Sequence, residues 1–278
     1  MKKLKPVIKW SGSKRSQAEQ ILQFVPSEVE TYIEPFVGGG SILGALMVSE
    51  NHKVGGYQIS DYNETLIGLW NAIKDTPEEL HYHYKELWVP LHEAVSIDDK
   101  KVVYNSVRSR LNEFKNPRDF MFIMRTCVNG MPRYNSSGGF NSPYHLNRDG
   151  IKPETLKSII LQWSELLNTN KVTFTHKSYE SVVAKKDSFM YLDPPYANTK
   201  GMYFDNFDVL PFFEWLEVQD SKYLLSFDGK SGEIDSTYSV PEKLYDKHVY
   251  LQSGNSSFKR LMTDNKSANV QESLYIKI

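Results

Sequence analysis

The chain has few of the residues that disulfide-stabilised, membrane-spanning or secreted proteins need. It contains one cysteine, Cys127, among 278 residues, which excludes an intramolecular disulfide and indicates a reducing compartment. Its longest apolar stretch, Ile42 to Val48, is interrupted by Gly44 and is far shorter than the roughly 20 residues that a membrane-spanning helix requires. The first fifteen residues are basic but lack an apolar segment, so we expect no signal peptide. These absences predict a globular, cytoplasmic protein.

An excess of charge of one sign is also missing, so no global field attracts this chain to nucleic acid or to a membrane. The 33 basic and 34 acidic residues give a net charge of −1. The basic residues are nevertheless clustered, because residues 100–150 hold nine Lys and Arg against three acidic residues. Six of the eight arginines lie there: Arg108, Arg110, Arg118, Arg125, Arg133 and Arg148. Since this segment also contains Gly, Asn and Pro turns, we interpret it as an arginine-rich loop for local docking to a polyanion, with a solvated basic face as the alternative.

Strand and helix patterns indicate an α/β sheet domain that is interrupted by an insertion. The predicted strands are residues 31–34, 57–61, 172–174, 188–192, 222–227 and 271–278. The predicted helices are residues 13–24, 41–48 with Ser41 as its cap, 64–122 with breaks near Pro77 and Pro117, and 153–167. We therefore predict one domain of residues 1–63 and 169–278, and an inserted, mainly helical domain with a hairpin over residues 64–168.

A glycine-rich loop follows the first predicted strand. Glu34 to Ser41 reads EPFVGGGS, and glycine there lets the backbone approach a ligand closely. Asp61 ends the next strand, where a carboxylate commonly binds ribose hydroxyl groups. The loop and the acid together favour a cofactor that contains adenosine. A tight structural turn for the loop and a helix cap for Asp61 are the alternatives.

The most specific motif is Asp193-Pro194-Pro195-Tyr196, which follows an apolar strand. Two prolines after a buried strand fix the backbone and lack N–H donors, so that the carbonyl groups remain as acceptors. A carboxylate, a rigid carbonyl and an aromatic face then meet at one strand end. This combination suits a planar group that carries an amino donor and stacks on Tyr196.

Taken in order, these motifs resemble the Dam-type family of adenine-specific DNA methyltransferases. The matching segments are residues 9–14 (KWSGSK), 34–40, 59–61, 129–135, 140–143 and 193–196. The resemblance implies a Rossmann-like class I methyltransferase sheet with helices on both faces, and makes the insertion a target-recognition domain. It implies methyl transfer from S-adenosyl-L-methionine to the exocyclic amine of adenine in a short, specific sequence of double-stranded DNA. Base flipping and direct displacement would achieve this without a metal.

The resemblance also assigns residues to roles. The implied catalytic residues are Asp193, Pro194 and Tyr196. The implied cofactor-binding residues are Trp10, Lys14, Phe36, Gly38, Gly40, Asp61 and Asp193. The implied DNA-binding residues are Lys9, Asn129, Met131, Arg133, Asn135 and Pro143. Among these, Arg133 is the predicted guanine-reading residue, and Met131 and Pro143 offer apolar contacts to a thymine methyl group.

The chain departs from the family pattern at the recognition segment. Val128 stands where an aromatic residue often precedes Asn-Gly, and Leu146 stands where an arginine is often found. A GATC-like target is therefore only a hypothesis. Cytosine exocyclic-amine methylation, methylation of RNA or protein, and a catalytically inactive DNA-binding protein on the same fold remain alternatives.

The remaining expectations concern partners and isolated residues. Double-stranded DNA is the expected partner, a cognate restriction endonuclease would act separately, and neither membrane nor metal is expected. The host would be a bacterial or phage-infected cell. His81, His83 and His92 lack metal-ligand spacing and are expected at the surface. A loop at residues 256–260 is read either as a phosphate contact or as a solvated hairpin.

Overall fold

The computed structural model describes residues 4–195, 207–231, 234–253 and 270–278. Its strands are β1 (Glu28–Glu34), β2 (Lys53–Asp61), β3 (Thr173–His176), β4 (Ser188–Leu192), β5 (Lys222–Ser231), β6 (Ile234–Asp235), β7 (Lys247–Ser253) and β8 (Val270–Lys277). Its α-helices are α1 (Ala18–Leu22), α2 (Ser41–Met47), α3 (Glu64–Asp75), α4 (Pro77–Glu93), α5 (Ile97–Phe114), α6 (Pro117–Thr126), α7 (Pro153–Thr169) and α8 (Val209–Glu217). Short 3-10 turns are η1 (Lys14–Ser16), η2 (Val128–Gly130), η3 (Tyr179–Ser181) and η4 (Glu242–Leu244). The predicted strands are confirmed, while β7 and α8 were not predicted.

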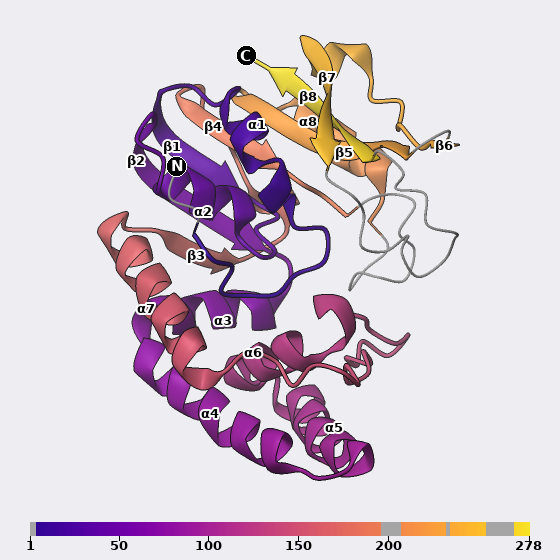
Figure 1. The fold of residues 1–278 in the computed structure, drawn as a ribbon. Helices are drawn as coiled ribbons and strands as arrows, with labels where there is room; N and C mark the ends of the chain where they lie inside the picture. Colours follow the sequence, from indigo (N-terminus) through magenta and orange to yellow (C-terminus); the bar gives the residue numbers. More distant parts are fainter. Residues whose placement is uncertain (1–3, 196–206, 232–233, 254–269) are drawn as a thin grey trace.

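The strands form one mixed sheet in the order β3-β2-β1-β4-β5-β8-β7, with β6 paired to β5 (Figure 1). Strands β1 to β5 run parallel to their neighbours in this order, whereas β8 runs antiparallel between β5 and β7. β1 and β4 are neighbours at the centre of the sheet. From β1 the chain continues to β2 on one side of this pair, and from β4 it continues to β5 on the other side. In such sheets a ligand crevice opens at the carboxyl ends of the two strands where the order reverses. This topology confirms the Rossmann-like prediction and places the ends of β1 and β4 next to each other.

Helices cover both faces of the central strands, as the side-chain alternation of β1 and β4 shows. Tyr32 and Tyr191 belong to one buried cluster, together with residues of α1 and α2. Ile33 and Met190, their neighbours along the strands, belong to a second cluster with residues of α8. Because successive residues of a strand point to opposite faces, the central strands are buried on both sides.

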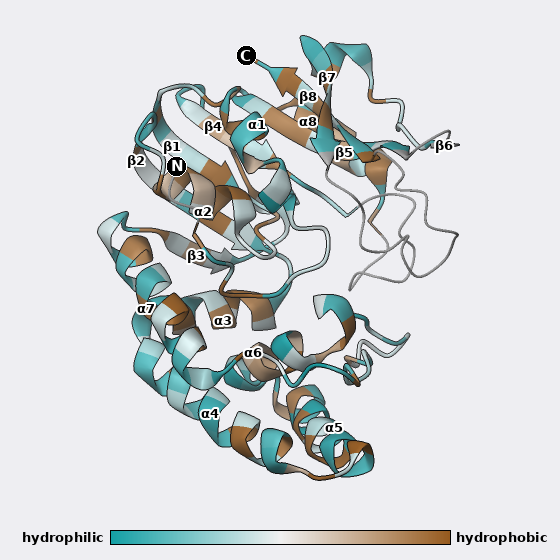
Figure 2. Ribbon diagram, viewed as in Figure 1, coloured by the Kyte–Doolittle hydropathy of each residue, from teal (hydrophilic) through white to brown (hydrophobic). Residues whose placement is uncertain are grey.

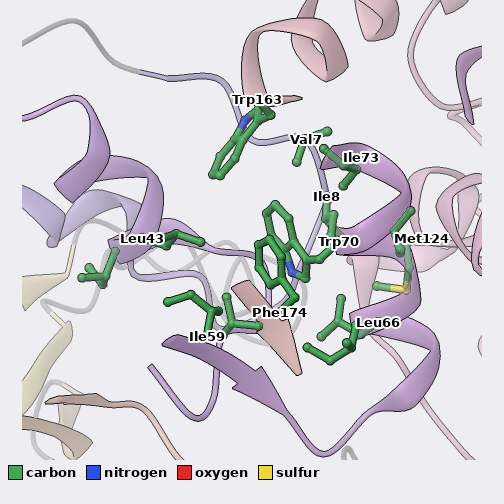
Figure 3. Close-up of a cluster of buried hydrophobic side chains, with 14 of the residues drawn as sticks. Val7, Ile8, Leu43, Ile59, Leu66, Trp70, Ile73, Met124, Trp163 and Phe174 are labelled. Carbon is green, nitrogen blue, oxygen red and sulfur yellow. The ribbon is translucent and has the colours of Figure 1, made fainter. Parts of the chain in front are cut away.

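The helices α3 to α7 lie together below the sheet, between β2 and β3 in the chain (Figure 1). Figure 2 shows that α4, α5 and α7 carry alternating hydrophilic and hydrophobic stretches, as expected for helices with one buried face. Their core is continuous with that of the sheet: Trp70 of α3 stacks on Phe174 of β3 at 5.3 Å between ring centroids, beside Trp163 of α7 (Figure 3). The division into a catalytic domain (1–63 and 169–278) and an inserted domain (64–168) stays a proposal.

Two local predictions are wrong. Ser41 does not cap α2, because the cap position is occupied by Gly40 and Ser41 is the first helical residue. The long helical stretch also breaks once more than predicted, between α4 and α5, where Ser96 and Asp99 form a capping box. Among the described residues, no helix is both long and apolar enough to cross a membrane.

Candidate active site

A cavity of about 580 Å³ opens at the carboxyl ends of the parallel strands. It brings together residues that are far apart in the sequence, because the segments after β1, β2 and β4 all meet at this edge of the sheet. Eight of the predicted site residues line it: Trp10, Lys14, Phe36, Gly38, Asp61, Met131, Asp193 and Pro194. The volume suits a ligand of nucleoside size.

The glycine loop, residues 34–41, packs against Trp10 and is hydrogen-bonded to Trp70. Gly38 adopts a φ of +45°, which strongly favours glycine, and a Cβ there would lie 2.8 Å from the indole nitrogen of Trp10. The Trp70 indole N–H donates to the Gly38 carbonyl oxygen at 3.0 Å. The loop therefore takes one conformation, with Trp10 covering it.

Gly40 lies near the end of the glycine loop. It does not line the cavity, and with a φ of +66° it forms the cap position of α2. A Cβ at this position would lie 2.7 Å from the Trp70 ring. Gly40 therefore shapes the loop through its contact with Trp70, and its predicted contact with a cofactor stays a prediction.

Asp61 connects the end of β2 to the glycine loop. One carboxylate oxygen accepts from the Gly38 N–H at 3.1 Å, and the other accepts from the Asn63 N–H at 3.0 Å. Burial raises the pKa of Asp61 to about 6, although these hydrogen bonds oppose the shift. Asn63 rather than Asp61 caps α3, which removes the helix-cap alternative for this carboxylate.

Asp193 pairs with Lys14 across the cavity. The Lys14 ammonium lies 2.8 Å from one Asp193 oxygen and 2.9 Å from the other, and it also donates to the Gly12 carbonyl at 3.1 Å. Glu272 of β8 lies 3.5 Å from the same ammonium. The Lys14 side chain is only 4% exposed, so this charge is neutralised by the carboxylates around it. Lys14 was predicted to bind the cofactor, and the structure places it on the predicted catalytic carboxylate.

Pro194 is buried and lies in the cavity wall directly after Asp193. Its position after β4 follows from the strand, because a proline pair cannot continue the sheet ladder. Tyr196, the predicted stacking residue, lies outside the described residues, as does the loop at 256–260.

Several cavity residues escaped sequence analysis. Glu34 is 2% exposed, accepts from the Tyr32 hydroxyl at 2.8 Å, and has its pKa raised to about 8 by burial. Nothing in the sequence of β1 marked Glu34 as buried, because the strand also carries the exposed Glu28 and Glu30. Tyr179 stands against Phe36 at 5.6 Å between ring centroids and forms an aromatic wall. No sequence feature marked it, because it follows β3 in an irregular segment.

The predicted recognition residues lie on a hairpin and its flanks in the helical half. Tyr134 and Phe140 form an antiparallel bridge. Among the six predicted DNA-binding residues, those with exposed side chains are Asn129, Arg133, Asn135 and Pro143.

Three of these residues have positions that refine the predictions. Met131 is 6% exposed and lies in the cavity wall, and its predicted contact with a thymine methyl group stays a prediction. The side-chain oxygen of Asn135 accepts from the backbone N–H groups of Ser137 and Gly139, and so builds the hairpin turn. Lys9 is half-buried and packs against Gly130, where a Cβ would lie 2.6 Å from its Cγ.

Most of the arginine cluster binds the protein itself. Arg110 donates to both oxygens of the fully buried Asp119, at 2.7 and 2.6 Å. Arg125 donates to the Val7 carbonyl at 2.6 Å and anchors the segment that leads to Trp10. Arg118 pairs with Glu79, and Arg108 donates to the Ser142 carbonyl. The interpretation of this cluster as a docking surface is therefore correct at most for the exposed Arg133 and Arg148.

Of the three histidines that were expected at the surface, His92 is exposed, whereas His81 and His83 are not. His81 is buried, and the ring of His83 hydrogen-bonds to Asp119 at 2.7 Å. Within the ranges that the structure describes, no three His, Cys, Asp or Glu side chains are grouped as a metal site.

Known proteins resemble this chain over most of its length. The family model described as D12 class N6 adenine-specific DNA methyltransferase matches residues 10–231. The type II methyltransferase M.MjaIII of Methanocaldococcus jannaschii is 30% identical over 264 residues, which cover 87% of this chain and 88% of the relative. The DNA adenine methylase of Vibrio cholerae is 31% identical over 203 residues, covering 71% and 67%. The type II methyltransferase M.CviBI of Paramecium bursaria Chlorella virus NC1A is 25% identical over 254 residues, covering 90% and 89%.

Proposed function

This chain belongs to the D12 class of N6 adenine-specific DNA methyltransferases, and we propose that it uses S-adenosylmethionine to methylate an adenine that is flipped out of a short, specific duplex sequence. The observation that carries this proposal is the cavity in which Asp193, the glycine loop and Asp61 meet. A chain that only binds DNA would not need a carboxylate and a nucleoside-sized crevice at one place.

The catalytic part of the proposal concerns Asp193 and Pro194. The adenine amine is a poor nucleophile because its lone pair is delocalised into the ring. Hydrogen bonds from its two N–H groups to the Asp193 carboxylate and the Pro194 carbonyl would favour a more pyramidal nitrogen and orient it for in-line displacement. Unstacking the base from the duplex costs a few kcal/mol, and stacking of the extruded base on Tyr196 would offset part of this cost.

Lys14 has a positioning role in this proposal. Its ammonium lies within 3 Å of both Asp193 oxygens, where the adenine amine must donate. A buried cation beside a carboxylate favours the ionised form, and so keeps Asp193 an acceptor. The incoming amine then takes one of the two oxygens from Lys14.

The residues around the glycine loop fit S-adenosylmethionine, which supplies a methyl group already activated on a sulfonium. Asp61 lies at the end of β2. Its pKa, although raised to about 6, still lies below neutral pH, so the ionised carboxylate can accept hydrogen bonds from ribose hydroxyls. Trp10, which lies against Gly38, and Phe36 provide apolar surface in the same cavity. No metal is required, because the sulfonium already activates its methyl group: the methyl–sulfur bond breaks as the nitrogen–methyl bond forms, and the sulfur leaves as a neutral thioether.

For recognition, we assign base reading to the hairpin. Arg133 is exposed, and its Nε donates to the sulfur of Met131 at 3.2 Å, so its guanidinium is partly oriented already. A bidentate contact to guanine suits this side chain, and we assign further DNA contacts to Pro143, Asn129 and Lys9. Since two similar proteins bear type II names, a cognate restriction endonuclease that cuts the same sequence is part of the proposal.

The test is product analysis. The chain is incubated with isotopically labelled S-adenosylmethionine and duplex DNA of mixed sequence, and the nucleosides of the product are separated. We expect label in N6-methyl-2′-deoxyadenosine, and, when duplexes of defined sequence are compared, only in those that contain one short sequence. Label in N4-methyl-2′-deoxycytidine, or label in an RNA substrate but not in duplex DNA, would disprove the proposed substrate.

A further inference from the structure

We propose that one face of α5 is a clamp that determines sequence specificity by fixing the orientation of Arg133. The clamp consists of Tyr104, Arg108 and Asn112, which are spaced four residues apart and therefore lie on one side of the helix. None of the three contacts a base in this proposal. The inference rests on the proposed function, since Arg133 has a base to read only if the chain methylates DNA.

Asn112 binds the hairpin as a neighbouring strand would. Its side-chain amide donates to the Phe140 carbonyl at 3.0 Å and accepts from the Phe140 N–H at 2.7 Å. The side chain thus satisfies both backbone groups of a residue whose other side faces Tyr134 in the hairpin bridge. A primary amide has the same donor and acceptor pair as a peptide group, so asparagine is well suited to this place.

Tyr104 and Arg108 hold the next part of the same arm. The Tyr104 hydroxyl donates to the Ser142 carbonyl at 2.8 Å, and Arg108 donates to the same oxygen at 3.3 Å. The buried Ser142 hydroxyl donates to the Met131 carbonyl and accepts from the Arg133 N–H at 2.9 Å. The backbone of Arg133 is therefore joined to α5 through one serine.

The hairpin needs this support because two backbone hydrogen bonds join its strands. The Asn141 N–H donates to the Arg133 carbonyl and the Asn135 N–H donates to the Gly139 carbonyl, each at 2.9 Å, whereas the other hydrogen bonds of Asn135 close the turn. An isolated two-stranded hairpin is marginally stable in water. A bidentate contact to guanine requires both nitrogens of the guanidinium at the right distance and angle. A loosened hairpin would therefore lose discrimination between bases before it lost affinity for the duplex.

The experiment compares Asn112→Ala with Asn105→Ala, an exposed asparagine on the same helix. The preferred sequence is first mapped on a randomised duplex pool, and rates are then measured on that sequence and on its single-base-pair variants. We expect Asn112→Ala to lower the rate ratio about tenfold at one base pair, and to leave the KM for S-adenosylmethionine unchanged. Asn105→Ala should match the wild type. An equal loss at every base pair would overturn the clamp.

A double variant distinguishes positioning from general weakening. If Asn112 acts through Arg133, Asn112→Ala adds no further loss of discrimination to Arg133→Ala. A full, independent loss in the double variant would contradict the proposal. Ser142→Ala gives a second route should Asn112→Ala fail to fold, and Ser142→Thr, which keeps the hydroxyl, should restore discrimination.

Hydrogen exchange tests the clamp without any methyl transfer. Asn112→Ala and Ser142→Ala should speed amide exchange in peptides covering residues 131–143, whereas Asn105→Ala should not. Unchanged exchange would refute the clamp even if the enzyme is active. If the wild-type chain methylates no duplex, the proposed function fails, while the exchange data still decide whether α5 holds the hairpin.

Discussion

The cavity at the edge of the sheet and the hairpin of the helical half are positioned by different physical means. In the cavity, Asp193 and Asp61 directly end buried parallel strands, so the sheet fixes their places. The hairpin that carries Arg133 has two backbone hydrogen bonds between its strands. Side chains of α5 hold it through further hydrogen bonds to Phe140 and Ser142. The comparison teaches that the proposed catalytic and cofactor-binding groups are fixed by the sheet, whereas the proposed base-reading groups are held by side chains from outside the hairpin. Substitutions near the cavity should therefore change the rate of methyl transfer, and substitutions around the hairpin should change its selectivity.

The largest expected effect is on the cavity side. Replacing Asp193 by Ala removes the acceptor for the adenine amine, and we expect the rate of methyl transfer to fall by about 10³-fold. Single-turnover rates with labelled S-adenosylmethionine provide the measurement. Asp187→Ala, an exposed carboxylate just before β4, is the matched control. If Asp193→Ala kept more than a tenth of the wild-type rate, Asp193 would not be the acceptor on which methyl transfer depends.

A second prediction concerns the pH dependence of folding on the cavity side. Burial raises the pKa of Glu34 from 4.5 to about 8, so the folded state keeps a proton that the unfolded state has released. Stability from this group is complete below pH 4.5 and is lost as the pH rises toward 8, at about 1.4 kcal/mol per pH unit. Urea unfolding at several pH values should show this slope in the wild type and a smaller one in Glu34→Gln. Equal slopes would mean that Glu34 is ionised in the folded protein.

The third prediction separates two arginines of one sequence cluster. Arg110→Ala leaves the buried Asp119 with His83, and we expect a loss of about 2 kcal/mol in unfolding free energy, moderated because Arg110 is 41% exposed. Arg133→Ala should leave stability unchanged and cost about 1–3 kcal/mol of discrimination at one base pair. Thermal unfolding and rates on variant duplexes measure the two effects. If Arg110→Ala lost discrimination between bases while Arg133→Ala lost stability, the proposed division between a structural and a base-reading arginine would be wrong.

The smallest expected effect is at the glycine loop. Gly38→Ala places a Cβ 2.8 Å from Trp10 at a φ of +45°, which costs about 1–2 kcal/mol and should weaken binding of S-adenosylmethionine roughly tenfold. Titration calorimetry gives the affinity. Gly56→Ala in β2 is the control, because its Cβ would meet nothing closer than the Glu30 carbonyl at 4.0 Å. Equal affinities in both variants would show that the loop conformation does not matter.

The sequence predicted the sheet and much of the cavity because both depend on local patterns. Asp193 follows the apolar strand β4 and Asp61 is the last residue of β2, and the carboxyl ends of parallel strands meet at one edge. The family comparison also favours adenine over cytosine, which the residues alone left open. Glu34 and Tyr179 were missed because burial and aromatic contacts between distant segments have no local signature.

The arginine cluster shows where sequence analysis could not succeed. Arg110 and Arg133 have the same chemistry and lie in the same basic segment, yet one binds Asp119 and the other is exposed. Only the packing of α4, α5 and α6 decides which arginine finds an internal carboxylate. The role of Asn112 was equally hidden, because nothing near it in the chain indicates that Phe140 will lie opposite.

The most direct test of the central claim is a crystal structure of the chain with duplex DNA and a non-transferring analogue of S-adenosylmethionine. The account predicts an extruded adenine whose amine lies within about 3.2 Å of an Asp193 oxygen and of the Pro194 carbonyl oxygen, with the Lys14 ammonium retaining only one carboxylate oxygen. An adenine that remains stacked in the duplex, or that enters a site away from Asp193, would contradict it.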